Sequence, residues 1–594
     1  MIGVFAGTPA GRRSAAELAA RLGPDAVVVD GPVRAALHRL WPRLGAAVFL
    51  LGPAATVRLV APLLVDEHTD PGVVCVDEAR GLAIALAGGH AGGADTLAER
   101  VAEVLGGAAV VSAGGDAVGT SPLDELVELL DAEVDGDLAA CGAAVAAGAP
   151  VRLVNPMRFP LPALPSTVAA DVDSPEWTVL VDDRIPVSAE QAAEWPGHPV
   201  RPTEGALLRL VPRTLVVGVG SSTGVSTSAV TTALSLVESE HGFDLGAVRA
   251  FATIDTKAAE QGIVEAVEDH GFWNADSALP LLRYPAAELS EVDVPNPDEE
   301  VRARTGTPSV AEAAALRGAA ELAGGGAVEL VVDKIRGAAV TVAVARVRPR
   351  GRLAVLGLGP DAADPRAPRV EAELRRAAVL VGLDRDVDRV RHLLRPGARV
   401  RASGPGAEEA RARAAAELAA NGAAVALVVS GDTELGRVTG PALEQVGADA
   451  ELVAVPGVSA ALAAAALLGA PLADDHAVID LSDPRVPWEV VERRVRAVAE
   501  GDLVVCFPGV PDRDGRWGRA LEILRAHRPP TTPVGLVSRA EDADQRVRTV
   551  LLVDLVPSEM DSGGSGGSGD TVIVGSSRTA LVAGHMVTVP PTGP

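Results

Sequence analysis

The chain has 594 residues, enough for roughly three or four domains of ordinary size. Its 53 Lys and Arg against 79 Asp and Glu give a net charge of −26, which argues against a nucleic-acid partner because phosphate binding requires clustered basic side chains. Hydrophobic residues make up 48% and charged residues 22%, a balance typical of a globular rather than a disordered chain.

Cysteine usage and hydropathy favour a cytoplasmic protein. Cys75, Cys141 and Cys506 lie far apart and form no CxxC pair, so we expect neither a disulfide framework nor a bound metal. The N-terminus lacks the basic segment and long apolar run of a signal peptide. No run of about 18 uncharged apolar residues occurs, so no membrane partner is expected.

Residues 1–148 alternate between strand and helix patterns and are predicted to form a first α/β domain. A helical pattern covers Ser14–Leu22. Alternation of this kind predicts a mostly parallel sheet covered by helices. The predicted strands are Ile2–Ala6, Ala26–Val29, Ala46–Leu51, Val73–Val76 and Ala83–Leu86.

A glycine-rich loop, LAGGHAGGAD (86–95), follows the last of these strands. Such a loop exposes backbone N–H groups to an anion, and His90 within it is suited to acid–base work near neutral pH. A loop histidine hydrogen-bonded to backbone is the structural alternative. Four glycines make a costly, flexible loop, so we favour a functional site.

The rest of the chain divides where the residue composition and the strand–helix pattern change. Proline recurs throughout 149–212, which predicts a small irregular module or a long connection. A strand beginning at Leu215 opens a second α/β domain over 213–347, and RVRPRGR (346–352) is predicted to be a linker. Residues 348–594 form the last unit, and the run SGGSGGSG (562–569) inside it is typical of flexible coil.

Three turns in the last unit follow predicted strands: GLGP (357–360), SGD (430–432) and VPGVSA (455–460). Ligands bind at the carboxyl ends of strands in open α/β sheets, so each turn is a candidate site. Each also has a structural explanation, namely a tight turn, an Asx-turn, and capping by Ser459 of a helix over Ala460–Leu468. Three such turns in one unit favour a ligand.

The first 347 residues resemble the CbiG family of cobalamin biosynthesis, the cobalt-precorrin 5A hydrolases. The N-terminal likeness lies in 52–106, and the C-terminal likeness in VVGVG (216–220), ATIDTKAAEQGI (252–263) and TPSVAEAAAL (307–316). The resemblance implies opening of a ring lactone with release of a two-carbon aldehyde, and His90 fits the role of base. The residues it implies for substrate binding are Arg58, Gly88, Gly89, Gly92 and Gly93.

The last unit resembles the tetrapyrrole methylases, most closely precorrin-3B C17-methyltransferase (CobJ/CbiH). The most specific stretch is LLGAPLADDHAVIDLSDPRVPWEVVERR (467–494). The family fold is a pair of α/β domains with S-adenosylmethionine in the cleft between them. The resemblance implies cofactor binding by Gly357, Gly359, Pro360, Ser430, Gly431, Asp432, Pro456, Gly457, Ser459, Ala460 and Thr571, and contact with the macrocycle by Asp483 and Trp488.

These resemblances predict a multidomain α/β enzyme of corrin-ring synthesis that methylates C17 of precorrin-3B or its cobalt form with ring contraction, fused to a lactone-opening region. Related methylases imply a homodimer. Departures from the family pattern in GDTELGRVTG (431–440) and at the Gly/Ser run leave an alternative, a non-catalytic tetrapyrrole-binding or assembly protein. A third alternative, a nicotinamide-dependent dehydrogenase, is disfavoured because no GxG turn after a predicted strand completes the GxGxxG motif.

Overall fold

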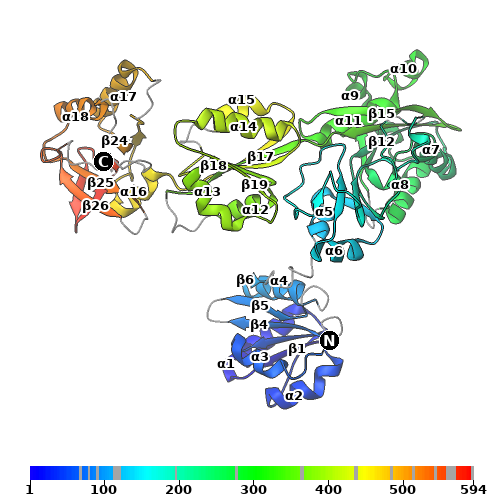
Figure 1. The fold of residues 1–594 in the computed structure, drawn as a ribbon, viewed down its shortest axis with the longest axis horizontal. Coiled ribbons are helices and arrows are strands. Elements are labelled where there is room, and N and C mark those ends of the chain that lie inside the picture. Colours follow the sequence, from blue (N-terminus) through cyan, green and yellow to red (C-terminus); the bar gives the residue numbers. More distant parts are fainter. Residues whose placement is uncertain are drawn as a thin grey trace. The chain divides into compact units, whose positions relative to one another are not determined.

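The computed structural model (Figure 1) describes residues 1–65, 70–77, 81–88, 93–111, 122–193, 195, 197–274, 279–360, 367–433, 439–481, 486–510, 515–540, 545–556 and 570–589. The chain forms two compact units, one of residues 1–129 and 137–149 and the other of residues 130–136 and 150–594. Both are α/β, which confirms the predicted fold class. The finer division into four domains stays a prediction.

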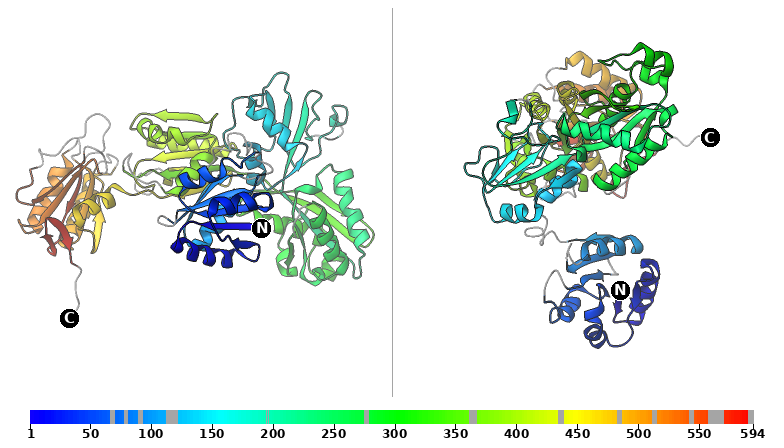
Figure 2. Two further views of the ribbon diagram at one scale, coloured as in Figure 1. Left: turned by 90° about the horizontal axis from the view of Figure 1, so that it is seen from below. Right: turned by 90° about the vertical axis from the view of Figure 1, so that its right-hand side faces the viewer.

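The first unit is one sheet with helices on both faces (Figures 1 and 2). Its strand order is β2-β1-β3-β4-β5-β6, and all pairs are parallel except β4 with β5, as predicted. Helices α1 and α4 pack on one face and α2 and α3 on the other. The elements are β1 Ile2–Ala6, α1 Pro9–Leu22, β2 Ala26–Val28, α2 Val33–Leu40, β3 Ala46–Leu50, α3 Pro53–Val60, β4 Gly72–Asp77, β5 Leu82–Ala87, α4 Ala94–Leu105, β6 Ala108–Val110, α5 Pro122–Leu130 and α6 Leu138–Ala146.

The proline-rich segment is more regular than the sequence predicted. Most of a five-stranded sheet, with the order β7-β11-β10-β8-β9, lies within it. Its prolines fall mainly between the strands, where their missing N–H groups cost no ladder hydrogen bond. The strands are β7 Ala132–Asp135, β8 Val151–Val154, β9 Val168–Ala169, β10 Trp177–Val181 and β11 Ala206–Pro212.

The next sheet has the order β14-β13-β12-β16-β15, with α7 and α8 on one face and α11 on the other. A Cβ added at Gly218 of β12 would lie 1.9 Å from the Ala311 carbonyl oxygen, so this glycine lets the first turn of α11 lie directly on the strand. The elements are β12 Leu215–Ser221, α7 Thr227–Ser239, β13 Val248–Ile254, α8 Gln261–Asn274, β14 Leu281–Tyr284, α9 Ala286–Ser290, α10 Glu299–Thr305, α11 Val310–Ala323, β15 Val328–Arg336 and β16 Val340–Val347.

A fully parallel sheet follows, with the order β19-β18-β20-β17-β21. Figure 1 shows α14 and α15 on one face and α12 and α13 on the other, and each pair packs on its own apolar cluster. The elements are β17 Gly351–Gly357, α12 Pro368–Arg376, β18 Val379–Leu383, α13 Asp384–Val390, β19 Arg399–Ser403, α14 Glu408–Ala420, β20 Ala424–Val429, α15 Thr439–Val446 and β21 Ala450–Val455.

The last part holds a five-stranded mixed sheet, β23-β24-β27-β25-β26, and a small sheet, β22-β29-β28. Helices α17 and α18 cover one face of the larger sheet and α16 covers the other. The elements are α16 Ala460–Leu468, β22 Gly469–Ala470, β23 His476–Val478, α17 Trp488–Glu500, β24 Val504–Val510, α18 Arg516–His527, β25 Pro533–Ser538, β26 Arg546–Leu551, β27 Asp570–Val574, β28 Thr579–Val582 and β29 His585–Thr588.

The segment predicted as a basic linker forms parts of two strands. Arg346 is the second-last residue of β16 and Arg352 the second residue of β17, and both are buried. Arg352 donates to both carboxylate oxygens of Glu373, at 3.2 and 2.8 Å. Two of its four arginines, Arg346 and Arg352, are therefore partners of buried carboxylates, and only residues 348–350 lie between the strands.

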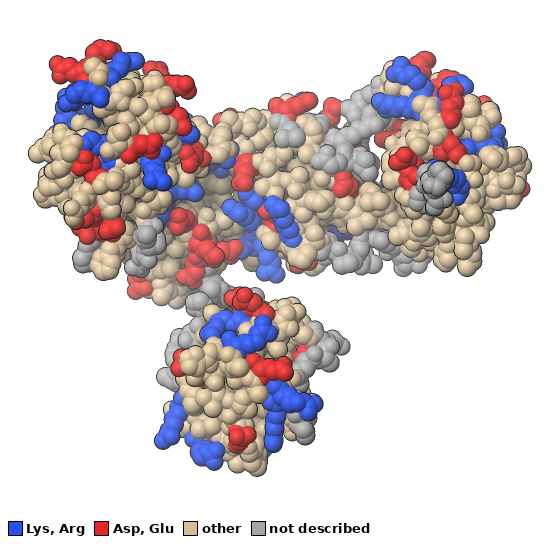
Figure 3. Space-filling view, turned by 180° about the vertical axis from the view of Figure 1, so that it is seen from behind, with Lys and Arg blue, Asp and Glu red and all other residues tan. Residues whose placement is uncertain are grey.

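Acidic and basic side chains are interspersed over the face drawn in Figure 3. Cys75, Cys141 and Cys506 are buried and free, and burial raises the pKa of each thiol. Of the helices in the described ranges, none has both the length and the apolar character needed to span a bilayer.

Asp182, after β10, gives a pH-dependent prediction. It is 3% exposed, and burial, reinforced by Asp183, raises its pKa from 3.8 to about 6. The folded state therefore binds more protons than the unfolded state between pH 4 and 6, and stability from this group falls as pH rises through that window. The carboxyl oxygen accepts from Arg184 N (2.9 Å), a bond that asparagine preserves.

Asp182→Asn is expected to stabilise the chain at pH 8 by up to about 3 kcal/mol and to have little effect at pH 4.5. Denaturation by urea at both pH values measures the difference. Asp173→Asn, at an exposed position, is the control and should leave stability unchanged at either pH. Equal stability of the Asp182→Asn variant and the native chain at pH 8 would contradict the prediction.

Candidate functional site

The three turns predicted separately from the sequence meet at the carboxyl edge of the parallel sheet. Strand β17 lies between β20 and β21, so the turns after these strands are neighbours. Gly359 N donates to Gly431 O (3.2 Å) and Gly431 N donates to Gly359 O (2.8 Å), which ties the first turn to the second. Both glycines have positive φ, +74° and +71°, a conformation that favours glycine.

The third turn packs against the other two through backbone alone. A Cβ added at Gly457 would lie 2.2 Å from Gly431 O and 2.7 Å from Gly357 C. One added at Gly357 would lie 2.4 Å from Gly457 N. Side chains are thus excluded from the contact, and the three turns form a backbone-packed cradle at the carboxyl edge of the sheet, the place where open α/β sheets bind ligands.

Charged side chains of α13 form hydrogen bonds with the first and second turns of the cradle. Arg389 donates to Leu358 O (2.9 Å) and to Gly359 O (3.2 Å). Asp386, 3% exposed, accepts a hydrogen bond from the Ser430 hydroxyl. These bonds fix the first and second turns to the same helix. Sequence analysis assigned a role to Ser430 but not to Asp386 or Arg389, because a helix residue reaching a preceding turn leaves no local pattern.

The rim of the cradle is open. Pro456 is exposed and Val458 is 42% exposed, whereas Gly431, Asp432 and Gly457 are partly exposed. The side chains of Pro456 and Val458 are therefore turned to the surface rather than packed against the other two turns. An apolar residue beside backbone polar groups suits a ligand with both a flat apolar part and hydrogen-bonding groups.

Ser459 and α16 connect the cradle to the last sheet. The Ser459 hydroxyl accepts from Leu462 N (3.3 Å), which confirms the predicted cap, and the helix spans Ala460–Leu468 as predicted. The buried face of α16 packs on β24, β25 and β27. The third turn is therefore joined through α16 to the sheet that contains β24, β25 and β27.

The remaining predicted methylase residues are less clearly placed. Thr571 lies in β27, is 5% exposed and pairs with Val537, so its role in cofactor binding stays a prediction. Trp488 begins α17; its indole N–H donates to Glu492 (3.0 Å) and its ring lies 4.0 Å from the Arg519 guanidinium. These contacts hold the Trp488 ring in place, and its contact with the macrocycle stays a prediction. Asp483 lies outside the described residues.

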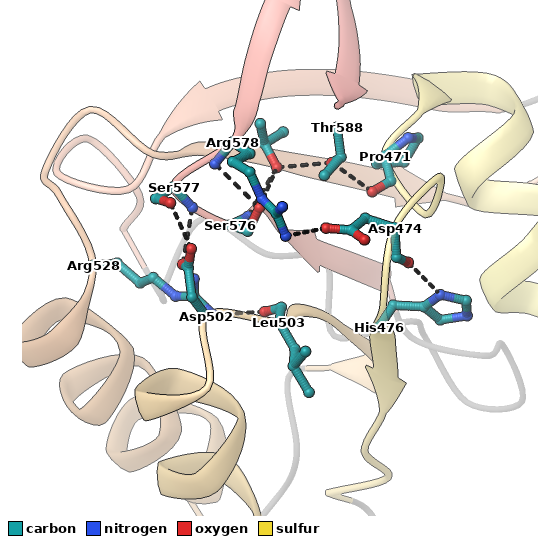
Figure 4. A network of polar contacts seen from close by, with 11 residues as sticks. Pro471, Asp474, His476, Asp502, Leu503, Arg528, Ser576, Ser577, Arg578 and Thr588 are labelled. Carbon is teal, nitrogen blue, oxygen red and sulfur yellow. Dashed lines mark hydrogen bonds and ion pairs between the residues drawn. The ribbon is translucent and has the colours of Figure 1, made fainter. Parts of the chain in front are cut away.

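A polar network braces one edge of the last lobe (Figure 4). Arg578 pairs with Asp474, and Asp502 accepts from Ser577 N (2.9 Å) and pairs with Arg528, which is 4% exposed. The contacts join the turn after β27, the segment before β23 and the turn before β24. The charges satisfy one another, so the network is a structural brace rather than a set of reactive groups.

In the first unit the glycine-rich loop joins β5 to α4. Gly88 has a φ of +79°, and its Cβ would lie 2.9 Å from Gly72 Cα; Gly93, at the N-cap of α4, has a φ of +72°. Because β5 is antiparallel to β4, this loop lies at the edge where β4 begins. Helix α3 runs back along the sheet to that same edge, with the exposed Arg58 in its last turn.

The topology therefore places Arg58, Gly88 and Gly93 at one edge of the sheet. His90, Gly89 and Gly92 lie outside the described residues, so the predicted base and half of the predicted anion loop remain predictions.

Comparisons with known proteins agree with this architecture. Residues 35–116 match the family Cobalamin synthesis G N-terminal, residues 215–345 match Cobalamin synthesis G C-terminus, and residues 352–556 match Tetrapyrrole (Corrin/Porphyrin) Methylases. Each match covers a part of the chain that the sequence resemblance had assigned to the same family.

Three curated relatives cover different parts. The cobalamin biosynthesis protein CobIJ of Mycobacterium tuberculosis is 38% identical over 39% of this chain and 45% of its own length, so the chain spans about half of that relative. The probable cobalt-factor III C(17)-methyltransferase of Salmonella typhimurium is 35% identical over 40% of this chain and 97% of its own. The cobalt-precorrin-5A hydrolase of Priestia megaterium is 27% identical over 53% of this chain and 82% of its own.

The packed glycine turns, the family matches and the near-complete coverage of a C17-methyltransferase lead to one assignment: the chain belongs to the tetrapyrrole methylase family, with cobalamin synthesis G domains preceding the methylase part.

Proposed function

We propose that the chain is a bifunctional enzyme of corrin-ring biosynthesis. Its C-terminal part methylates C17 of precorrin-3B, or of the cobalt form, with ring contraction, and its N-terminal part opens the lactone of a later cobalt-precorrin. The observation that carries the proposal is the backbone cradle formed by the turns at 357–360, 430–432 and 455–460, at the edge where a parallel sheet binds ligands.

The cradle residues fit S-adenosylmethionine. A Cβ added at Gly357 or Gly457 would clash with the backbone of a neighbouring turn, so these two glycines allow the three turns to pack together at the sheet edge where a ligand is expected. When bound, S-adenosylmethionine supplies an activated methyl group on a good leaving group. The protein's task is then orientation, which is worth several kcal/mol and needs no acid–base pair.

The residues that would hold the cofactor act through backbone groups and a few polar side chains. Gly431 and Gly457 are partly exposed at the rim, whereas Gly359 is buried and bonded to Gly431 through both its N–H and its C=O group. Ser430 and Asp432 follow the central strand. Asp386 and Arg389 hold the turns at fixed separation through their hydrogen bonds to Ser430, Leu358 and Gly359. A rigid cradle keeps the methyl group pointed at one carbon of the macrocycle.

In the N-terminal part, we propose that His90 acts as the base that activates water at the lactone carbonyl, and that N–H groups of the glycine-rich loop stabilise the oxyanion. Arg58, at the same edge of the sheet, is suited to a carboxylate of the macrocycle. The protein is further proposed to work in the cytoplasm as a homodimer, with no nucleic-acid or membrane partner.

His90→Gln is expected to lower release of the two-carbon aldehyde from cobalt-precorrin-5A by about 100-fold or more and to leave methyl transfer unchanged. Trapping the aldehyde and counting methyl groups transferred from labelled S-adenosylmethionine to precorrin-3B measure the two reactions in one preparation. His38→Gln, on a helix of the same unit, is the matched control.

The central part of the proposal fails if titration of the native chain with S-adenosylmethionine in a calorimeter gives no heat and precorrin-3B acquires no label. The outcome would instead support a tetrapyrrole-binding protein without methylase turnover. Equal loss of aldehyde release in the His38→Gln and His90→Gln variants would remove His90 from its proposed role.

A further inference from the structure

A cavity of about 520 Å³ lies in the cobalamin synthesis G C-terminal part, remote in sequence from the methylase turns. Its wall includes the residues that follow β12, the last turn of α10, the beginning of α11 and the hairpin between β15 and β16. The carboxyl end of β12 and the amino terminus of α11 thus open onto the same space, an arrangement suited to an anion.

Two of the residues that line this cavity carry a buried hydroxyl group without a partner among the described residues. Ser309 is 1% exposed and its Oγ makes no hydrogen bond. The residue occupies the N-cap position of α11, as predicted, yet its side chain does not cap the helix. Ser221 Oγ, at the end of β12, is likewise buried and unbonded. Leaving such groups unsatisfied is costly, so a ligand that accepts hydrogen bonds would satisfy both.

The charges on the wall are mostly positive, in contrast to the net charge of −26 of the whole chain. The lining residues include four cations and one carboxylate, Asp298. Lys257 Nζ donates hydrogen bonds to Glu260 Oε1 and Thr223 Oγ1, each at 2.8 Å. Lys334 Nζ donates to Asn296 O (2.9 Å). These bonds hold the two ammonium groups in place at the wall.

The other two cations are free to meet a ligand. Arg336 is mostly exposed and lies 3.7 Å from Asp298, a loose pair. Arg304, on α10, is exposed and has no ion-pair or hydrogen-bond partner in the described part of the chain. A guanidinium binds a carboxylate through two parallel hydrogen bonds, which an ammonium does not offer.

One buried carboxylate lies near the same helix terminus. Glu312, in the first turn of α11, accepts from Asn296 (2.8 Å) and from Lys334 N (3.3 Å) and is not part of the cavity wall. Its Oε1 atom thus holds the Lys334 backbone in place, and its Oε2 atom is buried without a hydrogen-bond partner among the described residues.

We propose that this cavity binds an organic polycarboxylate, with one carboxylate held by Ser309, Ser221 and the first turn of α11 and a second reached by Arg304. The macrocycle of the proposed function, which carries several carboxylates, is one source of such a ligand, and this identification rests on that function. A small free polycarboxylate is the other source.

The test uses the full chain and two probes: uroporphyrin III, a porphyrin rich in carboxylates, followed by its absorbance, and citrate, followed by calorimetry. Ser309→Ala removes one proposed hydrogen bond to a carboxylate of the ligand. It should weaken the affinity for the probe that occupies the cavity by about tenfold. Arg304→Glu reverses an exposed charge and should weaken it by about fivefold or more. Because the Ser309 hydroxyl is buried and makes no cap bond, Ser309→Ala should not lower the melting temperature of the ligand-free chain.

Arg302→Glu is the matched control, since Arg302 lies on the same helix, is exposed and does not line the cavity. Loss of uroporphyrin affinity in both cavity variants but not in the control supports the macrocycle as ligand, and loss for citrate alone supports a small polycarboxylate.

The inference is overturned if both probes bind the cavity variants as tightly as the native chain, or if Arg302→Glu loses as much affinity as they do. Titration with S-adenosylmethionine is run in parallel: its failure removes the proposed methylase but leaves the cavity result standing.

Discussion

Replacing Gly457 by alanine is expected to abolish detectable binding of S-adenosylmethionine and to slow methyl transfer by about 100-fold or more. The added methyl group would lie 2.2 Å from Gly431 O and 2.7 Å from Gly357 C, both of them backbone atoms that cannot rotate away. The third turn must therefore move outward from the other two. Displacement of a positioning element by about 1 Å is enough for a loss of this size.

Calorimetric titration and transfer of a labelled methyl group to precorrin-3B give the two readouts for Gly457→Ala. Gly404→Ala is the matched control, because Gly404 follows β19 of the same sheet, is exposed, and has no atom within 4 Å of an added Cβ. Circular dichroism establishes that both variants keep their fold. Native affinity in a folded Gly457→Ala chain would show that the cradle does not bind the cofactor.

The cradle illustrates what the sequence can and cannot predict. Each turn is visible locally, since a run of aliphatic residues ends in Gly, Pro or Ser, and the helix after Ser459 is predicted with its observed bounds. That the three turns touch depends on β17 lying between β20 and β21, which long-range strand pairing decides. The local patterns therefore give the candidates, and the strand order makes them one site.

The partners of buried charged and polar side chains could not be predicted from the sequence. Arg346 lies in a stretch of four arginines that suggests a solvated linker, and its carboxylate partner Asp183 is 163 residues away. Similarly, Ser309 has the sequence signature of a helix cap, and only the structure shows that its hydroxyl makes no cap bond. Pairings of this kind depend on tertiary contacts and leave no periodic signal.

Arg346→Met is expected to destabilise the part of the chain around β10 and β16 by about 3–5 kcal/mol. The guanidinium donates to both oxygens of Asp183, at 2.7 and 2.6 Å, in a pair that is almost fully buried, and it also stacks over Phe243 at 5.1 Å. Methionine preserves much of the volume but leaves the Asp183 carboxylate buried with Thr214 as its remaining hydrogen-bond donor. An uncompensated buried charge, rather than lost packing, is the main cost.

Two further variants separate charge from packing. Arg348→Met removes an exposed arginine two residues away and should leave the melting temperature unchanged. Asp183→Asn in the Arg346→Met background removes the stranded charge and should restore most of the stability, since replacing both members of a buried pair costs far less than replacing one. If the double variant is as unstable as Arg346→Met alone, then the stacking on Phe243 and the bond to Glu329 carry the stabilisation, and the ion pair with Asp183 does not.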